Sequence, residues 1–134
     1  KILYDALALA RKGLSYGIYD LMEFYGKKDS IQSEHIATGA AATFDINAGY
    51  SVPVFLTADL DVDVVNWPLN RTSHFTMLFK QDAVGGHEVT WPLNWLTEAN
   101  TLGPSISPVA GDTTFVHVTK IANNIYVSQG GVFK

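Results

Sequence analysis

The sequence contains no cysteine among its 134 residues. This absence excludes a disulfide-linked scaffold and any metal site that depends on thiolate ligands. Charged residues are also few, at 16% of the chain, whereas hydrophobic residues make up 47%. A chain with this much apolar surface and this little charge is expected to fold rather than to remain disordered.

Cations and long apolar runs are scarce as well. The nine Lys and Arg residues are scattered, and 13 Asp and Glu residues give a net charge of -4. Nucleic-acid affinity comes largely from clustered cations, so a nucleic-acid partner is not expected. No apolar run approaches the roughly 18 residues that a membrane-spanning helix needs, so membrane insertion is not expected either. Because the first residue is Lys rather than Met, we expect a fragment or a processed product.

Small or apolar residues recur between residues 3 and 24 with alternating spacings of four and three. They are Leu3, Leu7, Ala10, Leu14, Gly17, Leu21 and Phe24. This spacing predicts a helix with one face that packs against a partner. Gly13 and Gly17 each cost a helix about 1 kcal/mol relative to Ala, so two short helices are an alternative to one rod. We expect residues 1–30 to form a helical segment for oligomerisation or attachment, with packing on the chain's own domain as the alternative.

The periodicity changes to two after about residue 36. Side chains alternate between apolar and polar in Thr43–Ile46, Asp59–Val64, Phe75–Phe79 and Asn124–Val127, and turn-forming residues separate these stretches. Short strands separated by turns favour a mainly β fold, and the lack of intervening helical patterns argues against a parallel sheet. The sequence therefore predicts an antiparallel β-sandwich, jelly-roll-like, over residues 36–134, preceded by the short N-terminal helical segment.

A glycine pair marks the stretch between two of these strands. Gly85 and Gly86 lie within Gln81–Glu88, and the residues that follow alternate rather than begin a helix. A phosphate-binding loop would need a helix N-terminus at this point. We therefore expect a hairpin turn in which the glycines adopt positive φ angles.

Candidate reactive residues are few. Asp59, Asp61 and Asp63 alternate along one strand and are expected to form a solvated face, because neighbours on that face lie about 6–7 Å apart, too far for one ion. Glu88 and Glu98 could serve a glycoside hydrolase, but nothing in their spacing requires it. The four histidines lack metal-ligand spacing. We expect no catalytic residue, metal or cofactor, and hence no enzyme.

Aromatic residues supply the candidate recognition anchors. Trp67, Trp91, Trp95 and Tyr126 belong to the predicted β domain. Aromatic side chains on β-sandwiches usually lie in the core or at a subunit interface. If exposed, Trp67, Trp95 and Tyr126 are the residues that we expect to contact a partner.

Several of these residues together resemble a known kind of domain. The strongest element is Gln81-Asp82-x-x-Gly85-Gly86-x-x-Val89-Thr90-Trp91-Pro92, supported by Thr43–Ile46, Leu60–Asn66, Phe75–Lys80, Trp95, Pro104, Gly111–Thr114 and Asn124–Val127. Over about residues 38–134 the sequence is similar to the C-terminal β-domain found in bacteriophage tail fibres and other trimeric virion proteins.

The resemblance implies a homotrimeric structural protein of the phage particle. Its leading function is a tail-fibre or spike tip that contacts the host surface, with itself, other virion proteins and a host surface glycan or protein as partners. The alternatives are a capsid decoration or head-fibre protein and a carbohydrate-binding module of a secreted protein. The implied location is the virion, an extracellular particle.

Overall fold

The computed structural model describes residues 30–98 and 103–134, and it is mainly β, as predicted. The elements are β1 (His35–Ala37), β2 (Ala42–Asp45), η1 (Ile46–Ala48), β3 (Ser51–Leu56), β4 (Leu60–Val65), β5 (Ser73–Gln81), β6 (Val89–Thr90), β7 (Thr113–Ile121) and β8 (Asn124–Phe133). Residues 1–29, with the whole predicted helix seam, lie outside the described residues. Within the described ranges the one helical element is the three-residue η1, too short to cross a membrane.

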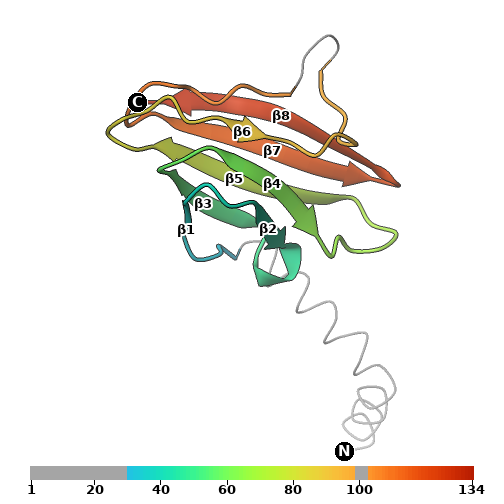
Figure 1. Ribbon diagram of the computed structural model, residues 1–134. Helices are drawn as coiled ribbons and strands as arrows, with labels where there is room; N and C mark the ends of the chain where they lie inside the picture. Colours follow the sequence, from blue (N-terminus) through green and yellow to red (C-terminus); the bar gives the residue numbers. More distant parts are fainter. Residues whose placement is uncertain (1–29, 99–102) are drawn as a thin grey trace, which may run out of the picture.

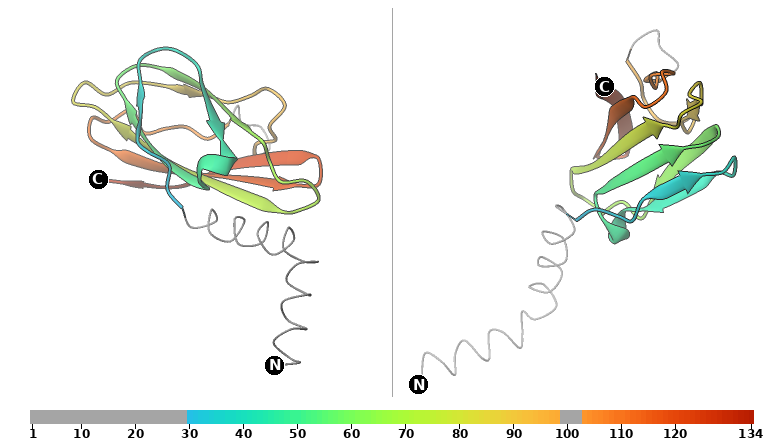
Figure 2. Two further views of the ribbon diagram at one scale, coloured as in Figure 1. Left: turned by 90° about the horizontal axis from the view of Figure 1, so that it is seen from below. Right: turned by 90° about the vertical axis from the view of Figure 1, so that its left-hand side faces the viewer.

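The strands form two sheets that lie in two layers (Figures 1 and 2). The five-stranded sheet has the order β1-β3-β5-β7-β8, and the three-stranded sheet has the order β2-β4-β6. From β1 to β7 the chain therefore changes sheet at every strand. Only the last connection, from β7 to β8, stays within one sheet and forms a hairpin.

The predicted antiparallel, jelly-roll-like pairing is wrong for most of the sandwich. The pairs β1–β3, β3–β5, β2–β4 and β4–β6 are parallel, and only β5–β7 and β7–β8 are antiparallel. A parallel pair needs a long crossover, which is a helix in most proteins. Here a strand of the opposite sheet serves as the crossover, so parallel pairing requires no helix.

The first six strands thus form a flattened coil that widens along the chain. His35 lies opposite Val54 in β1–β3, whereas Ser51 lies opposite Thr76 in β3–β5, so one turn of the coil takes 19 residues first and 25 residues next. Because the turn length changes, the coil leaves no fixed repeat in the sequence. The antiparallel hairpin of β7 and β8 then extends the five-stranded sheet beyond β5.

The hydrophobic core lies between the two sheets, because each strand alternates between buried and exposed positions. In β4 every second residue, Leu60, Val62 and Val64, is buried, and β5 follows the same pattern. The main core residues are Phe44, Val52, Val54, Leu56, Leu60, Val62, Val64, Phe75, Met77, Phe79, Trp91, Val116 and Val118. Burial of each large apolar side chain contributes about 1.5–3 kcal/mol to the free energy of folding.

A proline in the middle of β3 explains why β1 is short. Tyr50 O accepts from the Thr76 N–H of β5, and Ser51 O accepts from the Gln32 N–H on the β1 side. The N–H and C=O groups of successive residues in a strand point to opposite sides, so even-numbered residues of β3 face β5 and odd-numbered residues face β1. Pro53 consequently lacks an N–H on the β1 side. Pairing on that side is interrupted between the isolated bridge at Ile31 and the start of β1 at His35.

Candidate recognition site

A buried glutamine closes the inner face of β5. Phe75, Met77 and Phe79 take the preceding inward positions, and Gln81 takes the next one with only 1% of its surface exposed. Its Nε2 donates to His87 O at 2.7 Å and to Ser107 O at 3.0 Å, and its Oε1 accepts from the His87 N–H at 3.2 Å. Because a buried amide is stable only when hydrogen-bonded, both loops are held against the end of β5.

The next residue shapes the loop after β5. Asp82 Oδ1 accepts from the backbone N–H groups of Val84 at 3.0 Å and Gly85 at 2.9 Å, and it lies 3.0 Å from His87 Nε2. An aspartate that accepts from its own following backbone stabilises a turn. The hydrogen bonds from the Gly85 backbone and from the His87 side chain lower the pKa of Asp82 below its ordinary value.

The glycine pair has the predicted backbone angles in a different structural context. Gly85 and Gly86 have φ angles of +72° and +77°, which confirms the expected positive φ. The predicted hairpin is wrong, because β5 and β6 belong to different sheets and the segment is a crossover between them. At Gly85 a Cβ would lie 2.6 Å from Pro108 O, whereas the Gly86 N–H donates to that oxygen at 2.8 Å.

A buried aspartate joins the same region from the other side. Asp112 is 4% exposed, and its Oδ2 accepts from Ser107 Oγ at 2.7 Å and from Lys134 Nζ at 3.1 Å. The hydrogen bonds from Ser107 and then from Lys134 lower the pKa of Asp112. Its backbone oxygen accepts from the Gln81 N–H at 3.0 Å. We refer to the connected residues Gln81, Asp82, Gly85, His87, Ser107 and Asp112 as the loop clamp.

The loop clamp lies beside a groove of about 670 Å³ between residues 86–93 and 103–108. Buried or half-buried side chains of Val89, Trp91 and Ile106 line it together with the exposed Ser105 and Leu93. The indole N–H of Trp91 donates to the backbone oxygen of residue 104 at 3.1 Å and fixes the far wall. A groove of this size with apolar and polar lining can hold an extended ligand.

The edge of β6 adds backbone groups to the groove. The Leu60 N–H donates to Glu88 O at 2.9 Å, so the peptide groups of Glu88 face β4. In a parallel pair the peptide groups of successive residues point to opposite sides. The N–H and C=O of Val89 therefore face away from β4, on the side of the groove.

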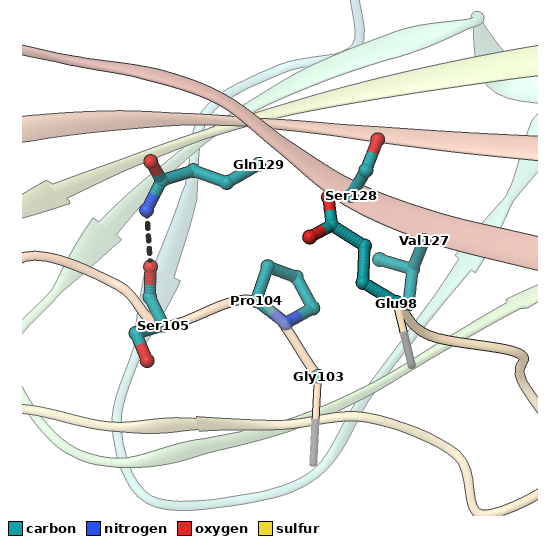
Figure 3. A pocket seen from close by; sticks show the side chains of 7 residues that line it. All are labelled: Glu98, Gly103, Pro104, Ser105, Val127, Ser128 and Gln129. Atoms are coloured by element: carbon teal, nitrogen blue, oxygen red, sulfur yellow. Dashed lines mark hydrogen bonds between the residues drawn. The ribbon is translucent and has the colours of Figure 1, made fainter. Parts of the chain in front are cut away.

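A smaller pocket of about 360 Å³ lies on the other side of residues 103–105, next to β8 (Figure 3). In Figure 3 the Gln129 side chain points to Ser105, and its Nε2 donates to Ser105 O at 2.7 Å. Glu98 and Ser128 also line this pocket. Pro104 lines both this pocket and the larger groove, so one segment forms the wall between them.

One predicted recognition residue belongs to the core instead. Trp95 is only 5% exposed and stacks on Trp91, with ring centroids 6.3 Å apart and an interplanar angle of 23°. Trp91 in turn meets the edge of Phe79 at 5.7 Å. Because these three rings pack on one another, Trp95 is buried, and the exposure on which its role as a candidate contact residue depended is not found.

The other two predicted recognition residues lie in different places. Trp67 follows β4, packs partly against the core and donates its indole N–H to Val64 O at 3.0 Å. Tyr126 lies on β8 opposite Thr119 and is 43% exposed. Because Trp95 is buried, Trp67 half-buried and Tyr126 exposed, the three predicted aromatic residues do not form one exposed surface. The predicted seam of Leu3, Leu7, Ala10, Leu14, Leu21 and Phe24 lies outside the described residues.

The acidic residues of β4 lie on its solvent side. Asp61 and Asp63 are exposed on the outer face, and Asp59 Oδ1 accepts from the Glu88 N–H at 2.9 Å. β4 is the central strand of its sheet rather than an edge, so these carboxylates do not protect a strand edge. Over residues 30–98 and 103–134, no three His, Asp or Glu side chains are grouped in a way that could hold a metal ion.

Sequence reasoning missed the role of Gln81 and Asp112. One signal was present for Gln81, because it continues the inward positions of Phe75, Met77 and Phe79 at a spacing of two. A polar residue at a core position indicates a buried hydrogen-bond network. Asp112 had no comparable signal, because its partners Ser107 and Lys134 are brought to it only by the fold.

The described part of the chain is thus a β-sandwich with clamped loops around a groove, an architecture suited to a structural or recognition module. The sequence model of the family described as "Putative phage tail fibre C-terminal domain" matches residues 37–127. The chain belongs to this family, which confirms the resemblance and gives the protein a structural role in the phage tail, in association with other virion components. No curated protein and no solved structure matches the chain.

Gly85 of the loop clamp and its neighbour Gly86 provide a matched test. Gly86→Ala should lower the free energy of unfolding by about 1 kcal/mol, because Ala disfavours positive φ but meets nothing within 4 Å. Gly85→Ala carries the same backbone strain and also a clash with Pro108 O, so we expect a loss of about 2–4 kcal/mol. Urea unfolding measures both values, and equal losses would contradict the close approach of the two loops.

The lowered aspartate pKa values predict a specific pH dependence. The stability contributed by Asp82 and Asp112 is fully present above the ordinary aspartate pKa of about 3.9 and is lost as the pH falls through the lower pKa of the folded state. Asp112→Asn should therefore lower the melting temperature at pH 7, and the difference from the unsubstituted chain should shrink in acid. The control is Asp61→Asn on the outer face of β4, and a pH-independent difference for Asp112→Asn would contradict the assignment.

Proposed function

We propose that this chain is the host-contacting tip domain of a homotrimeric phage tail fibre. The observation that carries the proposal is the set of exposed aliphatic side chains on the connections that surround the groove. Val84 and Val109 are 82% and 52% exposed, and Leu93 is fully exposed. Exposed aliphatic residues on fixed loops are typical of surfaces that bind a partner.

The loop clamp supports this proposal because it fixes the loops in advance. The Gly86 N–H reaches the backbone oxygen of residue 108, and Gln81 holds both loops at the end of β5. Loops that are already ordered lose less conformational entropy when they bind. In a trimer, three copies of a weak contact act together and increase the overall affinity.

The groove favours a host surface glycan as the partner, with a surface protein as the alternative. Val89, Trp91 and Ile106 offer apolar surface for the ring face of a sugar, while Ser105 and the Val89 peptide group offer hydrogen bonds. Membership of a tail fibre family favours the tail over the capsid as the location of the chain. The role is adhesive and not enzymatic: Glu88 and Glu98 are both exposed, whereas a glycosidase needs one carboxyl group in an apolar environment.

A competition assay tests the contact with the host. The full chain, added in excess, should slow adsorption of the parent phage to its host bacteria, and a fluorescently labelled chain should bind the same cells. Val84→Asp together with Leu93→Asp should weaken this binding by about tenfold or more, since each places a charge in an apolar contact worth roughly 1 kcal/mol or more.

The control for that assay is Leu69→Asp. Leu69 is 80% exposed, close to the value for Val84, but it lies in the β4–β5 connection at the opposite end of β5 (Figure 1). Binding by this variant should equal that of the unsubstituted chain. An equal loss for both variants, or a chain that neither binds cells nor competes with phage, would refute the proposed tip function.

The predicted helix seam provides the test of the trimer. Leu7→Asp together with Leu14→Asp should lower the mass measured by light scattering, because each substitution places a carboxylate in the proposed apolar seam. The β circular dichroism signal should remain, since both residues precede the sandwich. An unchanged mass would show that the seam does not hold the copies together.

A further inference from the structure

The outward-facing side of the five-stranded sheet carries little charge, and two of its rows are mainly apolar. Strand register places its side chains in four rows across the sheet. The first row contains Ile36, Phe55, Lys80, Thr113 and Phe133, and the second contains Pro53, Leu78, Phe115 and Gly131. The third row contains Ser51, Thr76, His117 and Ser128, and the fourth contains His74, Thr119 and Tyr126. We call this surface the outer apolar face. Among the residues in these rows, Lys80 is the only one with a permanent charge.

The outward side of the other sheet shows what a solvated face of this molecule looks like. Its paired outward positions are Thr43, Asp45, Asp61, Asp63, Val65 and Thr90, of which half are carboxylates. A sheet side that faces water normally carries polar residues at alternate positions. The same chain therefore follows this rule on one sheet and departs from it in the first two rows of the other, where Ile36, Pro53, Phe55, Leu78, Phe115 and Phe133 lie together.

A glycine leaves room for aromatic side chains on the β8 side of the outer apolar face. Phe115 contacts Phe133 with ring centroids 5.6 Å apart and His117 at 5.7 Å. A Cβ at Gly130 would lie 2.4 Å from His117 Nε2, so the imidazole occupies the space left by the missing side chain. Phe115 and Phe133 meet edge to face at 68°, so packed aromatic rings occupy this part of the face and are available to a partner.

We propose that the outer apolar face is a contact surface between copies of this chain. Five strands spaced about 4.8 Å apart and about eight residues long cover roughly 600 Å². In the homotrimer proposed above, on which this inference rests, three such faces surround a common axis and bury on the order of 1,800 Å² in total, which is within the range of stable, specific interfaces.

A copy of the chain is the occupant that fits this face. Each copy presents the same nearly uncharged rows, so the contact is self-complementary, and its area matches that of a specific interface.

The absence of cysteine from the sequence permits a direct test in the full chain. Thr76→Cys places a thiol in the outer apolar face, and Thr43→Cys is its control on the outward side of the other sheet. At a concentration that gives trimers by light scattering, a charged maleimide should label Thr76→Cys about tenfold more slowly than Thr43→Cys, because only dissociated copies react. Dilution should speed the labelling of Thr76→Cys and leave that of Thr43→Cys unchanged, and this comparison does not depend on the lower exposure of residue 76 within a single copy.

A second pair of substitutions connects the protection to the apolar contact. Leu78→Lys, added to Thr76→Cys, should restore fast labelling, whereas Val65→Lys, an outward position on the other sheet, should leave the protection intact. Circular dichroism of each variant checks that the β structure is retained. If Leu78→Lys does not fold, the dilution experiment with Thr76→Cys alone still decides the question.

The possible outcomes separate this inference from the proposed function. Trimers in which both thiols react equally fast would overturn the outer apolar face as a contact while leaving the trimer in place. Dilution could instead give a chain of monomeric mass in which Thr76→Cys is still protected. The chain's own residues would then cover the face, and both the contact and the trimer would be overturned. Binding to host cells is measured independently of either result.

Discussion

The structure depends on the buried amide of Gln81, because the parallel coil ends at this residue. β5 is the last strand of the five-stranded sheet with a parallel neighbour, and its other neighbour, β7, is antiparallel. The Gln81 side chain holds the outgoing crossover through His87 and the returning segment through Ser107, while its N–H binds Asp112 just before β7 begins. One residue thus connects the three segments that must meet for the chain to change from coil to hairpin.

The sequence predicts the strands well and their partners poorly. Alternation such as Leu60, Val62 and Val64 tells which side of a strand is buried, and those residues are buried as expected. Alternation carries no information on which strand lies next to it, so the parallel coil was not predictable from periodicity. The widening of the coil also removed the fixed repeat that would have indicated it. Pro53 could have marked an interrupted edge, but only once its neighbours were known.

The candidate site shows the same limit for single residues. Gly85 and Gly86 were correctly assigned positive φ because local sterics decide backbone angles. Trp95 was a candidate contact residue only if exposed, and it stacks in the core. The sequence could not decide between the two places, because an aromatic side chain has the same sequence signature in either. Polar residues are more informative when they occupy an inward position, as Gln81 does, since burial without partners is too unfavourable to be tolerated.

The two sheets give the molecule surfaces with different physical character. The acidic outward side of β4 suits contact with water, whereas the outer apolar face lies on the opposite layer. The groove follows β6, at the edge of the three-stranded sheet, and so does not compete with the outer apolar face for the same surface. If copies pack through their five-stranded sheets, each groove and its clamped loops remain on the outside of the assembly. Assembly and recognition can then operate at the same time, as a fibre tip requires.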